Sequence, residues 1–435
     1  MDWILLIALL VIAYALAAFI IHKKSLWQDH ITFYGPLMAV KTDRIGFFDR
    51  AIPFSRFLRV YGTIGVVMVV LVSVLMTLML IISILHIMVQ QPELTMANDP
   101  KNVLAIPGVN DFIPFTFAVW FGLLVTMVVH EFGHAILCRV EGIRVKSMGI
   151  LLAVIPIGAF VEPDEEDQER STGLPKMRMF GAGITNNILA GILCFALMIA
   201  LLGFAVPINT PLVKAVYVDN PAHLAGIPPN SIIKEVNGVL ISDRADVTAV
   251  LDKTVPGDRI PVIVEHKGVA TEYQLTLAAW PAEMSDKTSG FMGVSYYDAP
   301  LVKEQFGLLS TPLGVIILLA TPIYTIMEPV SWGHFGLLTI DSVDSTMWEV
   351  PFAGFWFVIQ ILFWCGWFNF VVGTFNALPL IPLDGGYILK EGIERLMDRR
   401  GWLQYAGSVV SAISYGMLAI LLAVVILPIL LNWKW

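Results

Sequence analysis

Cysteine and charged side chains are both scarce in this sequence. Its 435 residues include only three cysteines, which all lie in apolar runs, so the sequence implies no disulfide framework. Charged residues make up 14% of the chain and hydrophobic residues 57%, which predicts a polytopic membrane protein with some soluble mass. The formal net charge of −8 argues against nucleic acid as a partner.

About six apolar runs are long enough to cross a bilayer as helices. They cover residues 3–21, 61–88, 113–138, 179–206, 352–375 and 406–431. The first resembles a signal peptide, but its basic residues follow the run instead of preceding it, so we expect a retained helix. Two prolines and a glycine break a further apolar stretch, residues 305–330, which we expect to be re-entrant or interfacial.

The distribution of basic residues predicts the orientation in a cell membrane. The loop of residues 22–60 contains seven Lys or Arg residues and is therefore expected in the cytoplasm. The loop of residues 90–112 contains one basic residue and is expected outside. The third span then returns inward, which places its C-terminal half near the cytoplasmic side.

That third span contains the sequence His130-Glu131-Phe132-Gly133-His134. Two histidines four residues apart share one helical face, so both imidazoles can bind a single Zn²⁺ while the glutamate stays free as a base. Three ionisable side chains at bilayer depth are costly unless they line a wet cavity or bind a metal. The alternative is two core histidines with hydrogen-bonding neighbours, and it requires a separate buried partner for the glutamate.

A second polar segment follows the fifth span, with the sequence Asn-Ala-Leu-Pro-Leu-Ile-Pro-Leu-Asp-Gly-Gly at residues 376–386. Two prolines unwind the backbone just before Asp384, and basic residues after it place this end inside as well. The topology therefore brings Asp384 to the membrane level of His130 and His134. Three protein ligands with an open fourth position are typical of catalytic zinc, whose bound water reaches a pKa of about 7. An ordinary solvated turn at Asp384 is the alternative.

Two further segments surround this predicted zinc site. Residues 144–163 have the pattern of two short strands, and we expect a hairpin that dips back towards the metal. The acidic run after it, residues 162–170, is expected to be a solvated loop. In the fourth span, Gly183, Asn187 and Gly191 recur every fourth residue, which favours close helix packing. Asn187 either points at the active site or makes a helix-to-helix hydrogen bond.

Residues 211–279 differ from the rest of the chain in having more charge, short alternating runs and turn signals such as Asn237-Gly238. They predict a soluble, mostly β module on the outer side. The segments of residues 216–227 and 232–238 resemble a PDZ domain, a class that binds extended peptides by strand addition. Asn230-Ser231 stands where many PDZ domains have Gly-Asp.

These motifs, in this order and with a PDZ-like module between them, resemble the site-2 protease family of intramembrane zinc metalloproteases. The resemblance implies that His130, His134 and Asp384 hold one Zn²⁺ and that Glu131 is the catalytic base. It further implies that Asn187 and Asn376 steady the substrate or the oxyanion. The family also uses a hairpin to hold its substrate as an added strand, and the matching residues here are Gly158, Ala159, Phe160 and Val161.

The resemblance implies a transmembrane helix of another membrane protein as substrate, already shortened on its outer side. A membrane metal transporter or sensor that uses the same His/Asp cluster is the main rival, and a catalytically silent scaffold is another. Neither rival gives Glu131 a role. The predicted organisation is a two-helix region (1–90), a first core half (113–206), a PDZ-like domain (211–280), an interfacial or re-entrant segment (301–350), a second core half (352–400) and a C-terminal helix (401–435).

Overall fold

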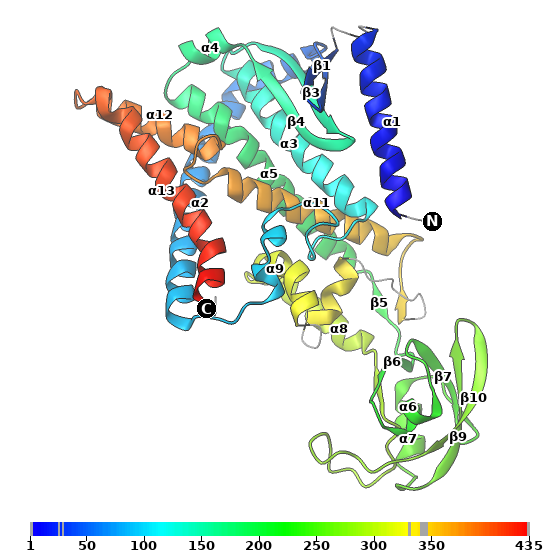
Figure 1. The fold of residues 1–435 in the computed structure, drawn as a ribbon. Helices are drawn as coiled ribbons and strands as arrows, with labels where there is room; N and C mark the ends of the chain where they lie inside the picture. The colour runs from blue at the N-terminus through cyan, green and yellow to red at the C-terminus, as the bar shows by residue number, and fades with distance from the viewer. Residues whose placement is uncertain (1–2, 25–26, 28–29, 329–331, 340–346, 433–435) are drawn as a thin grey trace. The chain divides into compact units, whose positions relative to one another are not determined.

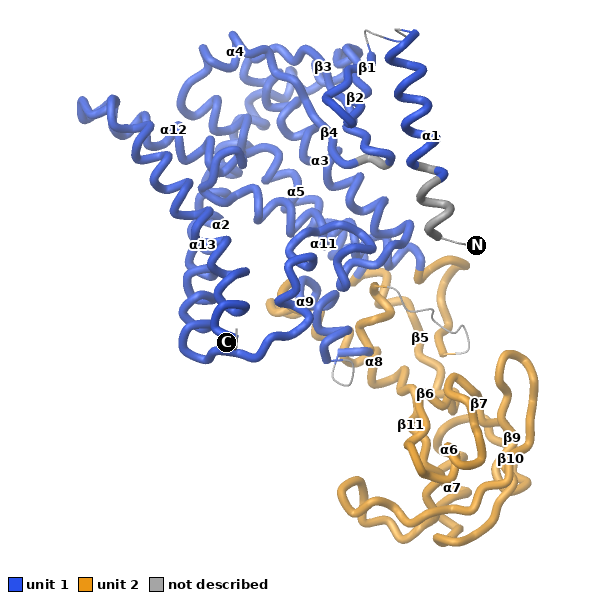
Figure 2. Tube along the Cα trace, in the orientation of Figure 1, with its two compact units in different colours: residues 1–198, 318–333, 357–435 blue, residues 199–317, 334–356 orange. Residues whose placement is uncertain are grey.

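The computed structural model describes residues 3–24, 27, 30–328, 332–339 and 347–432, and the chain forms two compact units (Figure 2). Unit 1 comprises Met1–Met198, Leu318–Gly333 and Phe357–Trp435. Unit 2 comprises Ile199–Ile317 and His334–Trp356. The predicted segment 301–350 includes residues 329–331 and 340–346, which lie outside the described residues.

Five helices in the described part of the chain are long and apolar enough to cross a membrane. They are α2 (Ser55–Gln90), α3 (Phe117–Val140), α5 (Leu174–Leu202), α11 (Phe355–Asn376) and α13 (Ala406–Leu431) (Figure 1). The protein is therefore a polytopic helical membrane protein. The first expected span does form a helix, α1 (Trp3–Lys23), although its place in a membrane stays a prediction.

The termini of α3 follow from local chemistry. The Thr116 side chain caps the helix by accepting a hydrogen bond from the backbone N–H of Val119. The helix ends just before Gly142, which has a φ of +80°, a left-handed conformation that favours glycine. The predicted metal-binding residues therefore lie in the C-terminal half of a regular helix.

Small residues allow α3, α5 and α11 to pack closely. A Cβ added to Gly133 of α3 would lie 2.5 Å from the carbonyl oxygen of Ala182 on α5. A Cβ on Gly191 of α5 would lie 2.7 Å from the Phe370 ring of α11. Helices with small residues at their contacts can bring their backbones close together. These short distances confirm the prediction that the fourth span packs closely through small residues.

Unit 1 also contains an antiparallel sheet of four strands in the order β1-β2-β3-β4. The strands are β1 (Ile31–Tyr34), β2 (Leu37–Thr42), β3 (Val145–Ala153) and β4 (Ile155–Pro163). The hairpin expected at residues 144–163 is present as β3 and β4. The interpretation of residues 22–60 as a mixed loop was wrong, because Ile31–Thr42 turns at Gly35, with a φ of +61°, and pairs β2 with β3.

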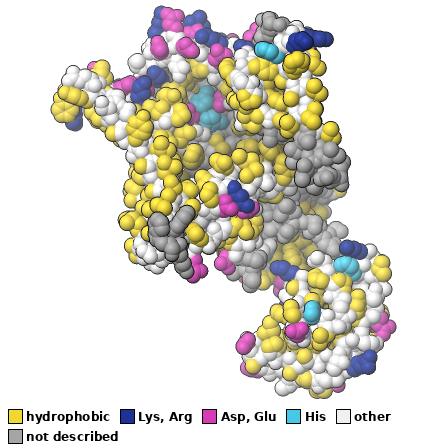
Figure 3. All heavy atoms as spheres, in the orientation of Figure 1, with side chains coloured by type: hydrophobic (Ala, Val, Ile, Leu, Met, Phe, Trp, Pro, Cys, Tyr) yellow, Lys and Arg dark blue, Asp and Glu magenta, His cyan; other side chains and the backbone are white. Residues whose placement is uncertain are grey.

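The acidic run after β4 forms a short helix, α4 (Glu165–Arg170), where a loop was expected. The Asp164 side chain caps it by accepting a hydrogen bond from the backbone N–H of Asp167. A hydrogen bond from Arg144, with a nitrogen-to-oxygen distance of 2.6 Å, lowers the pKa of Asp167 to about 2. Charged side chains gather around α4, whereas hydrophobic side chains cover the visible face over α2 and α13 (Figure 3).

Unit 2 is built around a sheet with the order β10-β9-β7-β6-β11, in which β8 also pairs with β7. Its elements are β6 (Leu212–Val216), α6 (Pro221–Ala225), β7 (Ser231–Val236), β8 (Val239–Leu240), α7 (Arg244–Leu251), β9 (Arg259–His266), β10 (Val269–Thr276) and β11 (Val294–Tyr296). Val213, Ile233 and Val262 lie in its buried core. Because β11 pairs with β6, the sheet continues beyond the predicted boundary at residue 280.

The remaining helices and strands lie between the elements described so far along the chain. In unit 2, β5 (Val206–Pro207) pairs with β12 (Trp348–Glu349), and α8 (Ala299–Phe306) follows β11. The next helix, α9 (Gly314–Met327), has 14 residues and is shorter than a bilayer-spanning helix. In unit 1, α12 (Asp384–Asp398) follows the proline-rich turn after α11. The re-entrant or interfacial placement of residues 305–330 stays a prediction.

Candidate metal centre and active site

Three predicted metal ligands converge at the contact between α3 and the start of α12. Asp384 Oδ2 lies 3.1 Å from His130 Nε2 and 3.3 Å from His134 Nε2. The two Nε2 atoms are 3.2 Å apart. Residues from distant parts of the chain thus place two imidazole nitrogens and one carboxylate oxygen around a common point.

The atoms of this cluster fit a zinc ion. Ligand atoms about 2.0–2.1 Å from a tetrahedral ion are about 3.3–3.4 Å from one another, close to the distances found here. Asp384 Oδ2 is buried and has no acceptable hydrogen bond among the described residues, although both Nε2 atoms lie near it. A cation among the three atoms would satisfy this buried oxygen. The donor set, two imidazoles and one carboxylate, is one that zinc prefers.

The turn before α12 aims Asp384 at the histidines. A Cβ added to Gly386 would lie 2.5 Å from the backbone nitrogen of Ile381, and a Cβ on Gly385 would clash with the carbonyl oxygen of Ala377. Only glycine therefore lets the chain fold back so tightly onto the end of α11. Asp384 becomes the first residue of α12, where the helix N-terminus favours a carboxylate.

One face of α5 supports both histidine rings. His134 Nδ1 lies 2.8 Å from the carbonyl oxygen of Met179, and His130 Nδ1 lies 3.2 Å from Asn187 Nδ2. Between them, a Cβ on Gly183 would lie 2.5 Å from His134 Nε2 and 2.7 Å from His130 Cε1. The contact with Met179 was not predicted, since it uses a backbone atom that any residue type provides.

A buried ion-pair network holds this part of α5 against α3 and α2. Arg178 Nη1 lies 2.9 Å from Oε1 of Glu141, the residue after α3, whose side chain is 5% exposed. Arg178 Nε also donates to Thr63 Oγ1 at 2.9 Å. Since Arg178 precedes Met179, the network fixes the backbone segment whose carbonyl oxygen faces His134.

Glu131 contacts the predicted substrate strand. Its Oε2 accepts a hydrogen bond from the backbone N–H of Val161 in β4, with a nitrogen-to-oxygen distance of 2.8 Å. Because β4 is the outermost strand of the sheet, this N–H points away from β3. Ala159 lies two residues earlier, so its backbone groups point to the same free edge. The structure thus places Glu131 beside the strand that contains Gly158, Ala159, Phe160 and Val161.

The two asparagines considered from the sequence, and a third asparagine on α11, have different surroundings. Asn187 is completely buried behind His130, and Asn376 Nδ2 donates to the carbonyl oxygen of Val372 in its own helix at 3.1 Å. Their roles towards substrate or oxyanion stay predictions. Asn369, also fully buried, donates to Thr126 Oγ1 at 2.8 Å and so connects α11 with α3.

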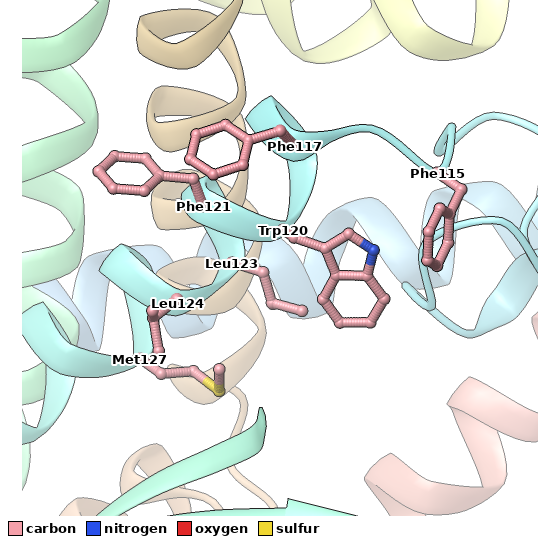
Figure 4. Close-up of a pocket in the computed structure, with 7 residues that line it drawn as sticks. All are labelled: Phe115, Phe117, Trp120, Phe121, Leu123, Leu124 and Met127. Atoms are coloured by element: carbon pink, nitrogen blue, oxygen red, sulfur yellow. The ribbon is translucent and has the colours of Figure 1, made fainter. Parts of the chain in front are cut away.

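An apolar groove of about 290 Å³ lies along the first half of α3 (Figure 4). It is lined by Phe115, Phe117, Trp120, Phe121, Leu123, Leu124 and Met127. Met127 is four residues before Glu131, so the groove ends one helical turn from the predicted base. None of these seven lining residues is charged.

Several known proteins are similar in sequence to this chain. A zinc metalloprotease, RasP from Shouchella clausii, is 26% identical over 268 residues, which cover 57% of this chain and 61% of that protein. An uncharacterized Methanocaldococcus jannaschii protein, MJ0971, is 26% identical over 291 residues, covering 67% and 60%. Zinc metalloprotease Rip1 from Mycobacterium bovis is 21% identical over 356 residues, covering 63% and 84%. The chain thus spans about 60% of the length of the first two relatives.

A solved structure also matches part of the chain. It is the PDZ domain of an SdrC-like protein from Listeria monocytogenes, with 19% identity and a TM-score of 0.19, covering 21% of this chain and 93% of that domain. The profile of peptidase family M50 matches residues 117–424, which include His130, Glu131, His134 and Asp384. The predicted assignment to the site-2 proteases is confirmed, and this chain belongs to peptidase family M50.

Proposed function

We propose that this protein is a zinc-dependent intramembrane endopeptidase that hydrolyses peptide bonds within or near transmembrane helices of other membrane proteins. The observation that carries the proposal is the position of Glu131. Its carboxylate lies one residue from the metal-binding His130 and accepts a hydrogen bond from the free edge of β4. Base, metal ligands and an edge strand suited to an extended peptide therefore meet at one place.

The chain's own residues account for the steps of hydrolysis. His130, His134 and Asp384 would hold zinc, which when bound acidifies water and polarises a carbonyl group. Glu131 accepts the proton from the attacking water and delivers it to the leaving amine. The free edge of β4 aligns the substrate as an added strand, and Asn376 is a candidate donor to the oxyanion.

The substrate proposed is a locally unwound transmembrane segment. A helix in lipid satisfies its amides internally, so a strand edge can pair only with a segment that has left the helical state. The apolar groove along α3 offers a surface for the hydrophobic side chains that such a segment keeps. Lipid tails cover the remaining apolar faces.

We place the active site near the cytoplasmic side of the cell membrane and the β-rich module outside. The support is the density of basic residues in the loop of residues 22–60, which contrasts with the single lysine of residues 90–112. A module on the outer side would select substrates by their outer portions. It would admit proteins that have already lost their outer portion.

The test of the filter role is deletion of residues 211–297, which removes the whole sheet from β6 to β11. We expect the variant to cleave substrates with intact outer domains, which the parent protein rejects. Cleavage is measured by electrophoresis after co-reconstitution with long and shortened substrates. Loss of cleavage towards both substrates would contradict the filter role.

The test of the proteolytic function is Glu131→Gln in the purified full-length protein. We expect cleavage of membrane-helix substrates to fall about 10²- to 10⁴-fold, because a general base contributes that much, while bound zinc remains. The exposed Glu166 of α4 provides the matched control, since Glu166→Gln should leave both properties unchanged. Zinc flux into vesicles without any proteolysis by the parent protein would overturn the proposal in favour of a transporter.

A further inference from the structure

We propose that Asn187 is a positioning residue whose carboxamide oxygen accepts a hydrogen bond from Nδ1 of His130. This bond holds the imidazole in the tautomer that turns the Nε2 lone pair towards Asp384. The inference rests on the proposed function, since it assumes that His130 binds zinc through Nε2. It gives Asn187 a role different from the contact with substrate or oxyanion that the sequence suggested.

The neighbouring histidine shows what such a contact does. His134 Nδ1 lies 2.8 Å from the carbonyl oxygen of Met179, which can only accept a hydrogen bond. The proton of neutral His134 is therefore on Nδ1, and Nε2 is left with a lone pair facing Asp384. Metal-binding histidines usually carry a partner of this kind on the nitrogen that does not bind the metal.

His130 needs an equivalent acceptor, and Asn187 is the side chain in position to provide it. With the amide nitrogen 3.2 Å from Nδ1, two donors would face each other when the proton is on Nδ1. In the same orientation Asn187 Oδ1 is buried and has no hydrogen-bond partner among the described residues. A half-turn of the carboxamide exchanges oxygen and nitrogen with almost no change of shape. It gives both Oδ1 and the Nδ1 proton a partner.

The location of Asn187 excludes direct contact with a substrate in this structure. Its side chain is completely buried, and a Cβ on Gly373 of α11 would lie 3.2 Å from the Asn187 Cβ. It approaches His130 from Nδ1, the opposite side of the ring from the Nε2 atom that faces Asp384. The side chain is thus enclosed by α3 and α11 at the far side of the ring.

Helix geometry explains how one element serves both rings. Met179, Gly183 and Asn187 follow at intervals of four residues and so share one face of α5. Gly183 provides the space for the rings, and the two flanking residues provide one contact each. This regular spacing supports the inference that this face of α5 holds both imidazole rings in position.

The test compares two substitutions in the full-length purified protein. Asn187→Leu removes both polar atoms and keeps the same branched arrangement of heavy atoms, and Asn187→Asp keeps an acceptor. We expect Asn187→Leu to weaken zinc binding about 10- to 100-fold, as for other partners of metal-binding histidines, and Asn187→Asp to stay within a few-fold of the parent. The zinc dissociation constant is measured by competition with a chromophoric chelator, and Co²⁺ absorption spectra report the ligand geometry.

The neighbouring asparagine provides a matched control. Asn186 accepts a hydrogen bond from the Tyr61 hydroxyl at 2.7 Å and donates to the carbonyl oxygen of Val129 at 3.3 Å, and neither bond involves a histidine ring. Asn186→Leu therefore makes the same chemical change one position away and should leave zinc affinity unaltered. Cleavage by Asn187→Leu should also recover at saturating zinc.

Several outcomes would overturn the inference. Parent-like zinc affinity in Asn187→Leu, or equal weakening in Asn187→Leu and Asn187→Asp, would do so. A cleavage defect that excess zinc cannot restore would instead favour contact with the oxyanion. Failure of the proposed function is distinguishable, because the parent protein would then cleave no substrate, whereas the zinc affinities of Asn187→Leu and Asn187→Asp would still report on the contact with His130.

Discussion

The metal centre and the free edge of β4 lie next to each other but are built in opposite ways. At the metal centre, His130, His134 and Asp384 are only 12–14% exposed, and α5 supports the two histidine rings from behind. At the strand edge, no strand of the described residues pairs with the outer side of β4, and one backbone N–H there is hydrogen-bonded to Glu131. The first region is closed by packing, and the second is open to pairing.

This difference separates the two tasks of a protease. Catalytic groups must hold a fixed geometry, which rigid packed helices provide better than loops or edges. A substrate must be recognised through its backbone, and an unpaired strand edge offers hydrogen bonds independent of sequence. The two regions should therefore respond differently to substitution, since changes at the centre affect zinc and changes at the edge affect substrate.

The largest effect is expected from Asp384→Ala. It removes one of three metal ligands and should lower cleavage by at least about 10³-fold, as does the loss of other essential catalytic groups. Zinc content, measured by atomic emission after dialysis, should fall with it. Asp398→Ala at the other end of α12 is the control and should retain zinc. Parent-like zinc content in Asp384→Ala would remove this residue from the metal centre.

A smaller effect on the same region is expected from Gly183→Ala. The added methyl group would lie 2.5 Å from His134 Nε2, and overpacking of this kind costs about 1–3 kcal/mol, so zinc affinity should fall about 10-fold. Gly181→Ala on the same helix is the control, because its methyl group would meet Val66 at an ordinary 3.4 Å. Equal zinc affinities in the two variants would show that α5 does not constrain the rings.

The smallest effect, and one confined to the substrate side, is expected from Ala159→Pro. Proline removes an N–H from the free edge of β4, and one backbone hydrogen bond contributes about 0.5–1.5 kcal/mol. We expect kcat/KM to fall about 3- to 10-fold with unchanged zinc affinity. Ala159→Gly keeps the N–H and should cleave like the parent. A loss of zinc in Ala159→Pro would mean that edge and centre are not separable.

The sequence was sufficient to predict which segments supply the centre. Two histidines four residues apart in a helix lie on the same helical face. The alternation of basic and non-basic loops predicted that Asp384 lies at the same depth in the membrane as these histidines. The spacing of Gly183 and Asn187 likewise indicated a close helix contact. Helical spacing is periodic along the chain, and the charge of a loop is a simple count of its residues. Both can therefore be recognised in the sequence without knowing the fold.

Other features depend on partners that the sequence does not reveal. The Met179 contact uses a carbonyl oxygen, and the β1–β2 hairpin is stabilised by pairing with β3, more than 100 residues later in the chain. Asn369 of α11 donates a hydrogen bond to Thr126 of α3, 243 residues earlier in the chain. In each case a tertiary partner decides the outcome, and local patterns do not identify that partner.

The arrangement of the ligands on α3 and α12 has a consequence for the lifetime of the protein. An ion that binds only the assembled helices stabilises the assembly by mass action, by about 4 kcal/mol when free metal exceeds the dissociation constant a thousandfold. Zinc held by His130, His134 and Asp384 would link α3 to α12 and so stabilise the packing of these two helices. A newly inserted chain would then gain catalytic competence and resistance to unfolding in the same event, and chelation would cost it both.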